Sequence, residues 1–365
     1  MTAIVREMVQ EDMRGVEALY KRVFGERALS YWRRRFEWQY VSNPATGLRP
    51  SRMWVGVKNR RIVGFLSSFP VQLKTPGGVA AVLCPGDLMV AADVRGEGLG
   101  ERVVRAYTNE AGLLPHGLAY SVGGGETFKR AGYRRVPAQQ AFVRPEQGGP
   151  VFREYARRHL PWWAQWLRPV IAPVAHGSAA LVNILHSPRQ STRLEIDLDP
   201  SIESDFDDLW SVAAGEIPFV FARDAPTLTW RYKDDPLIRH TLIAARDLDG
   251  TLMGYTALCL VQRGEIRIGK IMDLFCAPSR APRVVNALLP AVLHHFRVVG
   301  ADLISSKGLH PAIRREVRRC LYLKLPNYSS PALMLWNGDR NLMDTVFAAD
   351  NWHLSHADGD EDFVP

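Results

Sequence analysis

The sequence predicts an α+β protein made of two tandem domains, each a mixed, mostly antiparallel sheet flanked by helices. Three observations predict this class. The length of 365 residues suits two domains, a weak internal repeat runs along the chain, and both halves of the repeat show the same order of elements. With 47% hydrophobic residues, the chain can also bury two cores, which excludes a disordered or fibrous protein.

The internal repeat consists of four short matches in the same order. Trp38 and Trp230, which are 192 residues apart, are each followed by Tyr and Pro at the same spacing. The other three matches are dipeptides separated by 186 or 190 residues: Leu19-Tyr20 and Leu209-Trp210, Val63-Gly64 and Met253-Gly254, and Asp87-Leu88 and Asp273-Leu274. Because the offset stays nearly constant, we infer that one fold is used twice.

The elements of the first half follow from the hydrophobic pattern. Strands are predicted where apolar residues alternate or cluster between turn residues, and helices where they recur every three or four positions. The predicted strands are Ala3–Met8, Met53–Val57, Ile62–Pro70, Val79–Val90, Leu118–Val122 and Arg134–Arg144. One predicted helix begins at Gln10-Glu11-Asp12, a second runs from Gly98 to about Leu113, and a third spans Glu126–Ala131.

The second half repeats this order. Its predicted strands are Glu195–Leu198, a hairpin of His240–Arg246 and Thr251–Val261 around Asp249-Gly250, Lys270–Cys276, Leu303–Ser306 and Ala332–Trp336. Its predicted helices are Ile202–Ala214, Arg283–Val299 and Pro311–Cys320.

These elements divide the chain into an N-terminal domain of residues 1–147, a Trp- and Pro-rich linker of residues 148–192 and a C-terminal domain of residues 193–365. We expect the linker to be a Pro-broken segment that fills the groove between the domains, with its Trp residues as packing. The alternative is contact with a membrane surface, because three Trp lie among three Arg between Arg157 and Arg168.

The net charge of +8 is unevenly distributed. Residues 1–150 contain 22 basic and 13 acidic residues, whereas residues 191–365 have a net charge of −5. The basic half favours a polyanionic ligand. We do not expect nucleic acid to be that ligand, because the chain shows no zinc-finger, RNP or recognition-helix pattern.

Several features argue against metal sites and membrane spans. The four Cys form no CxxC pair and are typical of thiols in a reducing compartment. The sequence has no HExxH motif, and its acidic tail ends before a calcium loop would be complete. The N-terminus lacks a secretory apolar segment, and the longest uncharged stretch, Pro169 to Pro188, contains three Pro. We therefore expect a soluble, cytoplasmic protein without a metal or a transmembrane segment.

A glycine-rich turn joins a predicted strand to a predicted helix in the first half. The strand ends in Leu88-Met89-Val90, and the turn reads Arg95-Gly96-Glu97-Gly98-Leu99-Gly100. Backbone amides at such a helix start attract a pyrophosphate, and glycines let the backbone approach it. The P-loop pattern GxxxxGK[ST] is absent, and GxGxxG fails because no third Gly stands at the required spacing.

This turn resembles the acetyl-CoA loop of the GNAT N-acetyltransferase superfamily, [Gln/Arg]-x-x-Gly-x-[Gly/Ala], with Arg95, Gly98 and Gly100 at the motif positions. The segment from Phe128 to Tyr133 is similar to the family's later aromatic-x-x-x-Gly-aromatic segment. The resemblance implies that acetyl-CoA is a co-substrate. It also implies that the cofactor is bound by the strand end, the turn and Phe128.

The resemblance covers about residues 2–144 and is architectural only in the second half, whose equivalent turn, residues 277–283, has no glycine and two prolines. That turn cannot present the same row of amides. We therefore expect a cofactor-competent front domain and a degenerate back domain that shapes the acceptor site.

Acetyl transfer to an amine requires a polarised carbonyl, a base for the ammonium and an acid for the leaving thiolate. The resemblance implies that a backbone N–H of Leu88–Val90 polarises the carbonyl. Many relatives use a Tyr as the acid at the first aromatic of the later segment, but Phe128 cannot donate a proton. Tyr133 is then the candidate acid, and Asp87 and Glu126 are candidate bases, acting directly or through water.

Each of these three residues also has a purely structural interpretation. Tyr133 could be a core aromatic, Asp87 an edge carboxylate and Glu126 a charge at a helix start. The leading hypothesis is an acetyl-CoA-dependent N-acyltransferase that acts on the amine of a small molecule or amino sugar. The alternatives are a non-catalytic acyl-CoA-binding or sensor protein and an aminoacyl transferase of the same fold.

Overall fold

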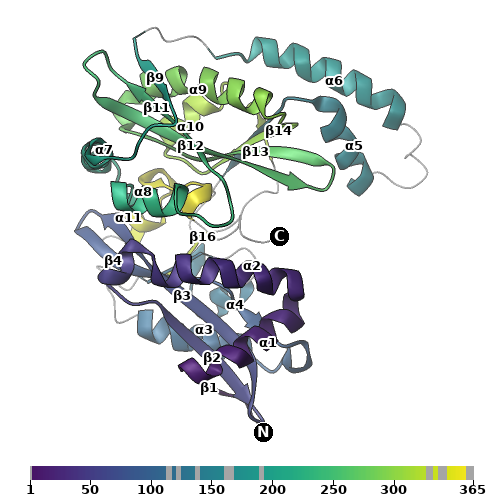
Figure 1. Ribbon diagram of the computed structural model, residues 1–365, viewed down its shortest axis with the longest axis vertical. Helices are drawn as coiled ribbons and strands as arrows, with labels where there is room; N and C mark the ends of the chain where they lie inside the picture. The colour runs from purple at the N-terminus through teal and green to yellow at the C-terminus, as the bar shows by residue number, and fades with distance from the viewer. Residues whose placement is uncertain are drawn as a thin grey trace.

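The structure, a computed structural model, consists of two domains stacked along its longest axis (Figure 1). It describes residues 2–111, 117–120, 125–135, 140–159, 168–188, 193–325, 332–335 and 343–358. The N-terminal domain occupies one end, with α1–α4 around its strands, and the C-terminal domain occupies the other.

The N-terminal domain is built on an antiparallel sheet. Its strands are β1 (Ile4–Glu7), β2 (Arg52–Lys58), β3 (Arg61–Thr75), β4 (Gly78–Pro85) and β5 (Met89–Val90). Its helices are α1 (Met13–Phe24), α2 (Glu26–Phe36), α3 (Leu99–Ala111) and α4 (Gly125–Arg130). Leu19 and Tyr20 on α1 and Val103 and Val104 on α3 enter one buried core, as the predicted helical periodicity requires.

The C-terminal domain repeats this plan. Its strands β9 (Glu195–Leu198), β11 (Thr241–Arg246), β12 (Leu252–Arg263) and β13 (Ile266–Cys276) are antiparallel, and β14 (Leu303–Lys307) pairs with β13 in parallel. Its helices are α7 (Ser204–Glu216), α8 (Ala225–Tyr232), α9 (Ala281–Val298) and α10 (Pro311–Val317). The predicted two-domain α+β architecture is confirmed.

The two domains exchange a strand reciprocally. The strand β8 (Ala141–Pro145) leaves the N-terminal half and inserts between β14 and β15 (Leu323–Lys324). The strand β16 (Ala332–Leu335) returns from the C-terminal half and inserts between β6 (Gly117–Tyr120) and β7 (Arg134–Arg135). The single predicted strand Arg134–Arg144 is therefore wrong, because its two ends belong to different sheets.

The matching tryptophans of the repeat meet at the domain junction. The rings of Trp38 and Trp230 stack with centroids 4.8 Å apart. Each indole N–H donates to the other residue's carbonyl, Trp38 to Trp230 over 2.7 Å and Trp230 to Trp38 over 2.8 Å. Residue i contacts j as j contacts i, which is the pattern of a two-fold symmetric interface.

Two short strands extend the N-terminal sheet with residues from the C-terminal half. The strand β10 (Phe219–Phe221) pairs with β3, and β17 (Trp352–His353), which follows α11 (Met343–Phe347), pairs with β10. Both therefore carry C-terminal residues into the junction between the domains.

The linker folds into two helices, α5 (Gly148–His159) and α6 (Arg168–Leu185). They lie along the C-terminal domain at the end remote from the N-terminal domain (Figure 1), so the expectation that the linker fills the inter-domain groove is wrong. Gly148 and Gly149 let α5 approach the α6 backbone at Ala175 and Ala172. The three linker tryptophans, Trp162, Trp163 and Trp166, lie outside the described residues.

Three structural findings concern the cysteines, possible metal ligands and possible membrane spans. All four Cys are buried, and none forms a disulfide. Within the described ranges, no group of His, Cys, Asp and Glu is arranged to hold a metal ion. No helix in the same ranges has the length and hydropathy needed to cross a bilayer.

Candidate functional site

The glycine-rich turn forms the entrance to α3. Gly96 and Gly98 have φ of 87° and 72°, a region that residues with a Cβ rarely adopt, and open space surrounds both positions. The first hydrogen bond within the helix runs from the Arg102 N–H to the Gly98 carbonyl over 3.2 Å. The N–H groups that precede Arg102 in the first turn therefore have no partner inside the helix. This arrangement suits a phosphate group.

The turn is held against the sheet by the first residue of α3. Leu99 is buried against β2 and β3, where Gly56 and Gly64 leave room for it. A Cβ at Gly56 would lie 2.8 Å from Leu99 Cδ1. On the exposed side, Lys58 forms an ion pair with Glu97 at 2.8 Å. The sheet thus positions the turn before any ligand binds.

Two arginines lie at the turn. Arg95 Nε donates to the Val90 carbonyl over 3.2 Å, which ties the turn to β5 while the guanidinium remains exposed. Arg102 is half-buried, and its Nε is a buried donor without a hydrogen-bond partner among the described residues. A phosphate oxygen would satisfy that donor. Arg102 therefore joins Arg95–Gly100 as a candidate phosphate ligand.

The strand that enters the turn carries a β-bulge. Opposite residues 65–68 of β3, the strand made of β4 and β5 has one residue more between its paired positions Pro85 and Met89. The bulge takes Leu88 out of the ladder of paired residues. A backbone N–H that leaves the ladder can donate to a ligand instead. This geometry supports the expectation that an N–H of Leu88–Val90 polarises a carbonyl.

The candidate base Asp87 lies in this bulge and has three donors. Its carboxylate accepts from Trp32 Nε1 at 2.9 Å, from Arg35 Nη2 at 2.6 Å and from the Tyr40 hydroxyl at 3.0 Å. Both residues of the Arg35–Asp87 ion pair are largely buried. The observed contacts hold α2 to the bulge, which gives Asp87 a structural role in this domain.

The candidate base Glu126 is exposed at the start of α4. Its carboxylate pairs with Lys129 at 2.5 Å, and this hydrogen bond lowers the pKa of Glu126. The following residue, Thr127, lies beside the glycine-rich turn, since a Cβ at Gly100 would be 3.7 Å from Thr127 Cγ2. Of the three candidates for proton transfer, Glu126 is the one in open contact with solvent.

The candidate acid Tyr133 is buried. Its hydroxyl accepts a hydrogen bond from Thr108 Oγ1 over 3.2 Å, and burial raises the pKa of Tyr133 to about 12. Its ring meets that of Phe128 edge to face with centroids 5.3 Å apart. Phe128, expected to contact the cofactor, is itself a core residue. Among the described residues, no hydrogen bond joins Tyr133 to Asp87 or Glu126.

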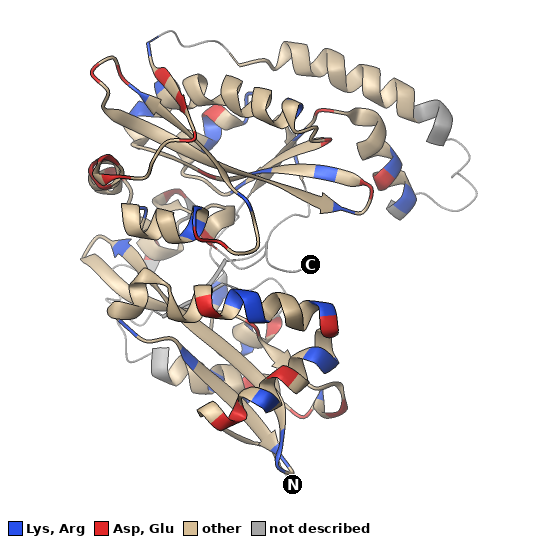
Figure 2. Ribbon diagram, in the orientation of Figure 1, with Lys and Arg blue, Asp and Glu red and all other residues tan. Residues whose placement is uncertain are grey.

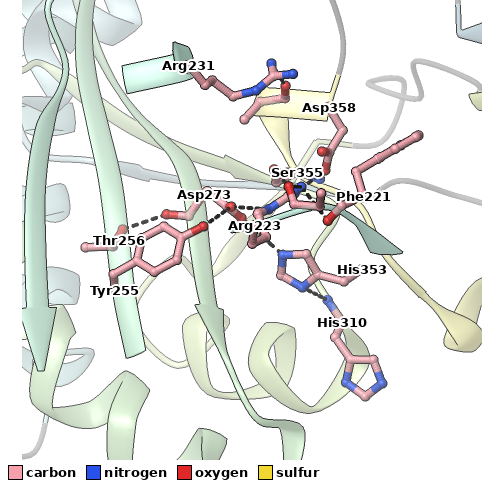
Figure 3. A network of polar contacts seen from close by, with 12 residues as sticks. Phe221, Arg223, Arg231, Tyr255, Thr256, Asp273, His310, His353, Ser355 and Asp358 are labelled. Carbon is pink, nitrogen blue, oxygen red and sulfur yellow. Dashed lines mark hydrogen bonds and ion pairs between the residues drawn. The ribbon is translucent and has the colours of Figure 1, made fainter. Parts of the chain in front are cut away.

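A second polar network, which the sequence analysis missed, lies at the junction of the domains (Figure 3). At its centre is Asp273, the counterpart of Asp87, which is fully buried on β13. Its carboxylate accepts from Arg223 Nε at 2.6 Å, from the Tyr255 hydroxyl at 2.9 Å and from His353 Nε2 at 3.1 Å. Burial opposes its ionisation, but these donors, Arg223 above all, hold the pKa of Asp273 well below its usual range.

The network joins the two domains. Arg223 also donates to Asp358 over 2.6 Å, and the backbone N–H of His310 donates to His353 Nδ1 over 3.3 Å. His353 must then carry its proton on Nε2, facing Asp273. Arg223 follows β10 and His353 lies in β17, two strands of the N-terminal sheet, whereas Asp273 belongs to the C-terminal sheet. Both carboxylate oxygens of Asp273 accept hydrogen bonds, so the network holds the N-terminal and C-terminal sheets together.

The counterpart of the glycine-rich turn, residues 277–283, has a different chemistry. The N–H and Oγ of Ser279 both donate to the carboxylate of Glu216, over 2.8 and 2.7 Å. Pro278 and Pro282 supply no N–H. A carboxylate of the chain itself thus occupies backbone and side-chain donors at the position equivalent to the open helix start of the first domain.

The only sequence signal for the missed network was the match of Asp87 with Asp273. Its partners Arg223, His353 and Asp358 come from two segments far apart in the chain, residues 219–223 and 352–358, so their convergence was not visible in the sequence. A cavity of ≈ 30 Å³ lies beside Arg223 and Asp358.

Comparisons with known proteins agree with the geometry. Residues 4–135 match the family described as "Acetyltransferase (GNAT) domain". No protein of curated function matches the sequence. Among solved structures, a probable N-acyltransferase of unknown function from Enterococcus faecalis has a TM-score of 0.54 and 11% identity over 83% of this chain. The present chain spans 64% of the length of that protein.

Two further structures cover more of the chain. A GCN5-related N-acetyltransferase from Anabaena variabilis has a TM-score of 0.59 and 12% identity, over 92% of this chain and 73% of its own. The N-myristoyltransferase of Saccharomyces cerevisiae, solved with myristoyl-CoA, has a TM-score of 0.57 and 11% identity, over 92% of this chain and 83% of its own. At these identities the likeness is one of fold. Together with the family match, it shows a GNAT acetyltransferase domain at residues 4–135, within a chain that shares the fold of these proteins over most of its length.

Proposed function

We propose that the protein is an acyl-CoA-dependent N-acyltransferase that transfers an acetyl group to the amine of a small molecule or amino sugar. The observation that carries the proposal is the turn Arg95–Gly100, with its two left-handed glycines, its free amides at the start of α3 and the arginines beside it. The donor set is that of a pyrophosphate site, and the acyl-CoA bound by the yeast neighbour carries such a group.

In this mechanism the chain mainly binds and orients the acyl-CoA and the amine. The turn and Arg102 hold the pyrophosphate, which directs the thioester towards the bulge at Leu88. There a backbone N–H donates to the thioester carbonyl as negative charge develops on its oxygen. The amine nitrogen forms a bond to the carbonyl carbon, and the carbon–sulfur bond breaks. The thiol sulfur leaves with the electron pair and takes up a proton.

The proton transfers are assigned as predictions. Glu126, exposed next to the turn, would accept the ammonium proton through water, and Asp87 is the alternative base. Tyr133 would return a proton to the leaving thiolate, since its raised pKa keeps the phenol protonated at neutral pH. The variants Glu126→Gln, Asp87→Asn and Tyr133→Phe test these roles. A loss of CoA release with unchanged acetyl-CoA affinity, measured under conditions in which the variant is fully folded, would support the role of that residue.

The cofactor site is tested by Gly98→Glu and Arg95→Ala, with acetyl-CoA affinity measured by calorimetry. Gly98→Glu introduces a Cβ at positive φ and a negative charge at the phosphates, so we expect affinity to fall at least about tenfold. The matched control is Gly250→Glu, at a hairpin glycine with φ of 82° and open surroundings in the other domain. Unchanged affinity in both loop variants would overturn the proposal.

One observation favours a second candidate, a non-catalytic acyl-CoA sensor. Asp87 accepts from three side chains, one of them the cationic Arg35, and Tyr133 is buried, so neither is poised for proton transfer in the observed state. CoA release measured across a panel of amines separates the two functions. Tight acetyl-CoA binding without turnover on any amine would favour the sensor.

A further inference from the structure

A small cavity lies at the junction between the domains, and residues of both domains line it. Phe69 and Cys84 belong to the N-terminal sheet, and Trp230, Arg231 and Asp358 come from the C-terminal half. The cavity has a volume of ≈ 30 Å³ and is partly open to solvent. About 10–15 Å³ of such volume holds one water molecule, so the cavity admits a group of about two heavy atoms. It therefore suits one end of a ligand and not a whole molecule.

Asp358 brings an unpaired oxygen to this cavity. Its side chain is only 1% exposed. The Oδ2 atom accepts from Arg223 Nη2 at 2.6 Å and from the N–H and the hydroxyl of Ser355 at 2.8 and 3.1 Å. The Oδ1 atom is also buried, and it has no hydrogen-bond partner among the described residues. A buried carboxylate oxygen without a donor is costly, so a ligand that donates to Oδ1 would remove this cost.

Arg231 brings donors to the same cavity. Its Nη1 donates to the carbonyl of Ala357, and its guanidinium carbon lies 5.0 Å from the centre of the Trp230 ring. Because Ala357 directly precedes Asp358, these contacts hold the guanidinium beside that carboxylate, and Figure 3 shows both side chains on the same side of the network. A guanidinium has five N–H donors, so the bond to Ala357 leaves donors for a ligand.

The charges around the cavity favour a neutral polar group as its occupant. Asp358 pairs with Arg223, and Arg231 adds a second positive charge. Figure 2 shows both basic and acidic residues on or next to α2 and α8, on the two sides of the junction, so neither sign of charge dominates there. An ammonium would meet two guanidinium groups, and a carboxylate would meet the unpaired oxygen of Asp358. A hydroxyl avoids both conflicts, because it can donate to Asp358 Oδ1 and accept from Arg231.

We infer that this cavity binds a hydroxymethyl group of the acceptor, whose hydroxyl donates to Asp358 and accepts from Arg231. The rings of Phe69 and Trp230, which also line the cavity, offer apolar surface to the methylene. The inference rests on the proposed acyl transfer. It narrows the acceptor from amines in general to amines that carry a primary hydroxyl, such as amino sugars.

The position of the cavity along the N-terminal sheet suits this role. Cys84, which lines the cavity, directly precedes Pro85, where the bulge begins. The four residues from Cys84 to Leu88 span at most about 14 Å. An acceptor anchored by its hydroxymethyl group would therefore bridge no more than about that distance to bring its amine to the thioester at the bulge.

The test is the binding of two sugars to the full chain, measured by titration with saturation-transfer NMR. Glucosamine carries a hydroxymethyl group, and its 6-deoxy analogue carries a methyl group in the same place. We expect glucosamine to bind at least about tenfold more tightly, because a site built to hydrogen-bond a hydroxyl discriminates against a ligand that lacks it. Asp358→Asn should lower this ratio to about threefold, since hydrogen bonds to an uncharged acceptor are about half as strong.

Asp358→Asn also weakens the pairing with Arg223, so a second variant leaves that pair intact. Thr227, half-buried on α8, lines the cavity, and Thr227→Leu should fill it and lower glucosamine affinity at least about fivefold. The matched control is Thr229→Leu, at a half-buried threonine of the same helix that does not line the cavity. It should bind both sugars as the unaltered chain does.

Acetyl-CoA affinity, measured on the same samples, separates this inference from the proposed function. A chain that binds acetyl-CoA but binds both sugars equally, or neither, would overturn the inference and leave acyl transfer standing. That is the result expected if the cavity holds only water. Equal losses of glucosamine affinity in Thr227→Leu and Thr229→Leu would overturn it too. Failure of the unaltered chain to bind acetyl-CoA would overturn the proposed function and this inference with it.

Discussion

The glycine-rich turn Arg95–Gly100 and its counterpart at residues 277–283 occupy the same place in two copies of one fold, between a bulged strand and a long helix. In the first copy the helix start is open, with left-handed glycines and free N–H groups. In the second, two prolines remove donors and Glu216 occupies those of Ser279. The difference teaches that only the first copy leaves these backbone donors without an internal partner, as the binding of a phosphate there would require.

The two carboxylates at the equivalent bulges differ in another way. Asp87 binds residues of its own domain, Trp32, Arg35 and Tyr40, and keeps some exposure. Asp273 is fully buried and binds Arg223 and His353, which are delivered by strands of the other domain's sheet. In the first copy this carboxylate thus holds α2 to the bulge beside the glycine-rich turn. In the second copy it joins the two sheets.

The largest expected effect separates these two carboxylates. Asp273→Asn removes one of the two carboxylates that pair with the buried Arg223, and leaves Asp358 as the other, so the free energy of unfolding should fall by about 3–5 kcal/mol. Asp87→Asn should cost about 1–3 kcal/mol, because its pair lies nearer to solvent. Urea unfolding of both variants checks the order. A larger loss of unfolding free energy for Asp87→Asn would contradict the assignment of Asp273 as the residue that holds the two sheets together.

The next largest expected effect is a loss of stability of the first domain at alkaline pH, which depends on Tyr133. Burial raises the pKa of Tyr133 to about 12, above its unfolded value of about 10. The protonated phenol therefore contributes stability below pH 10, and this contribution, about 3 kcal/mol, is lost as the pH rises from 10 to 12. Unfolding temperatures of the unaltered chain and Tyr133→Phe should converge over that range. A constant difference would mean that Tyr133 is not buried as described.

The domain junction provides a test of symmetry. Trp38→Phe and Trp230→Phe each remove one indole donor and leave one buried carbonyl without its hydrogen bond. Each should lower the free energy of unfolding by about 1–3 kcal/mol, and the two losses should be nearly equal. Urea unfolding of the two variants measures both losses. If the two losses differ by more than about 1 kcal/mol, the two tryptophans do not contribute equally to the stability of the junction.

The smallest effect concerns the degenerate turn. Glu216→Gln weakens two exposed hydrogen bonds to Ser279, so we expect a loss of about 0.5–1.5 kcal/mol of stability. Acetyl-CoA affinity should not change, in contrast to Gly98→Glu. Calorimetry on the two variants side by side sharpens the comparison, and altered affinity in Glu216→Gln would place a cofactor in the second copy.

Much of the fold could be predicted from local pattern. The helix that carries Leu99 and Val103, the hairpin at Asp249-Gly250 and the repeat through Trp38 and Trp230 all rest on residues close in the chain or on spacing within a copy. The catalytic assignments were weaker for the same reason. Whether Asp87 or Tyr133 is exposed depends on residues such as Arg35 and Thr108 that no spacing relates to them.

The sequence by itself determined the repeated α+β plan and the glycine-rich turn, because hydrophobic periodicity and the need for Gly at positive φ are properties of short segments. Only the tertiary structure decided that β8 and β16 are exchanged between the sheets, that α6 has an apolar face on its outer side, and that the partners of Asp273 lie on or next to strands of both sheets. A short strand has the same alternating pattern whichever sheet it joins, so its partner is chosen by distant edges that local sequence does not specify.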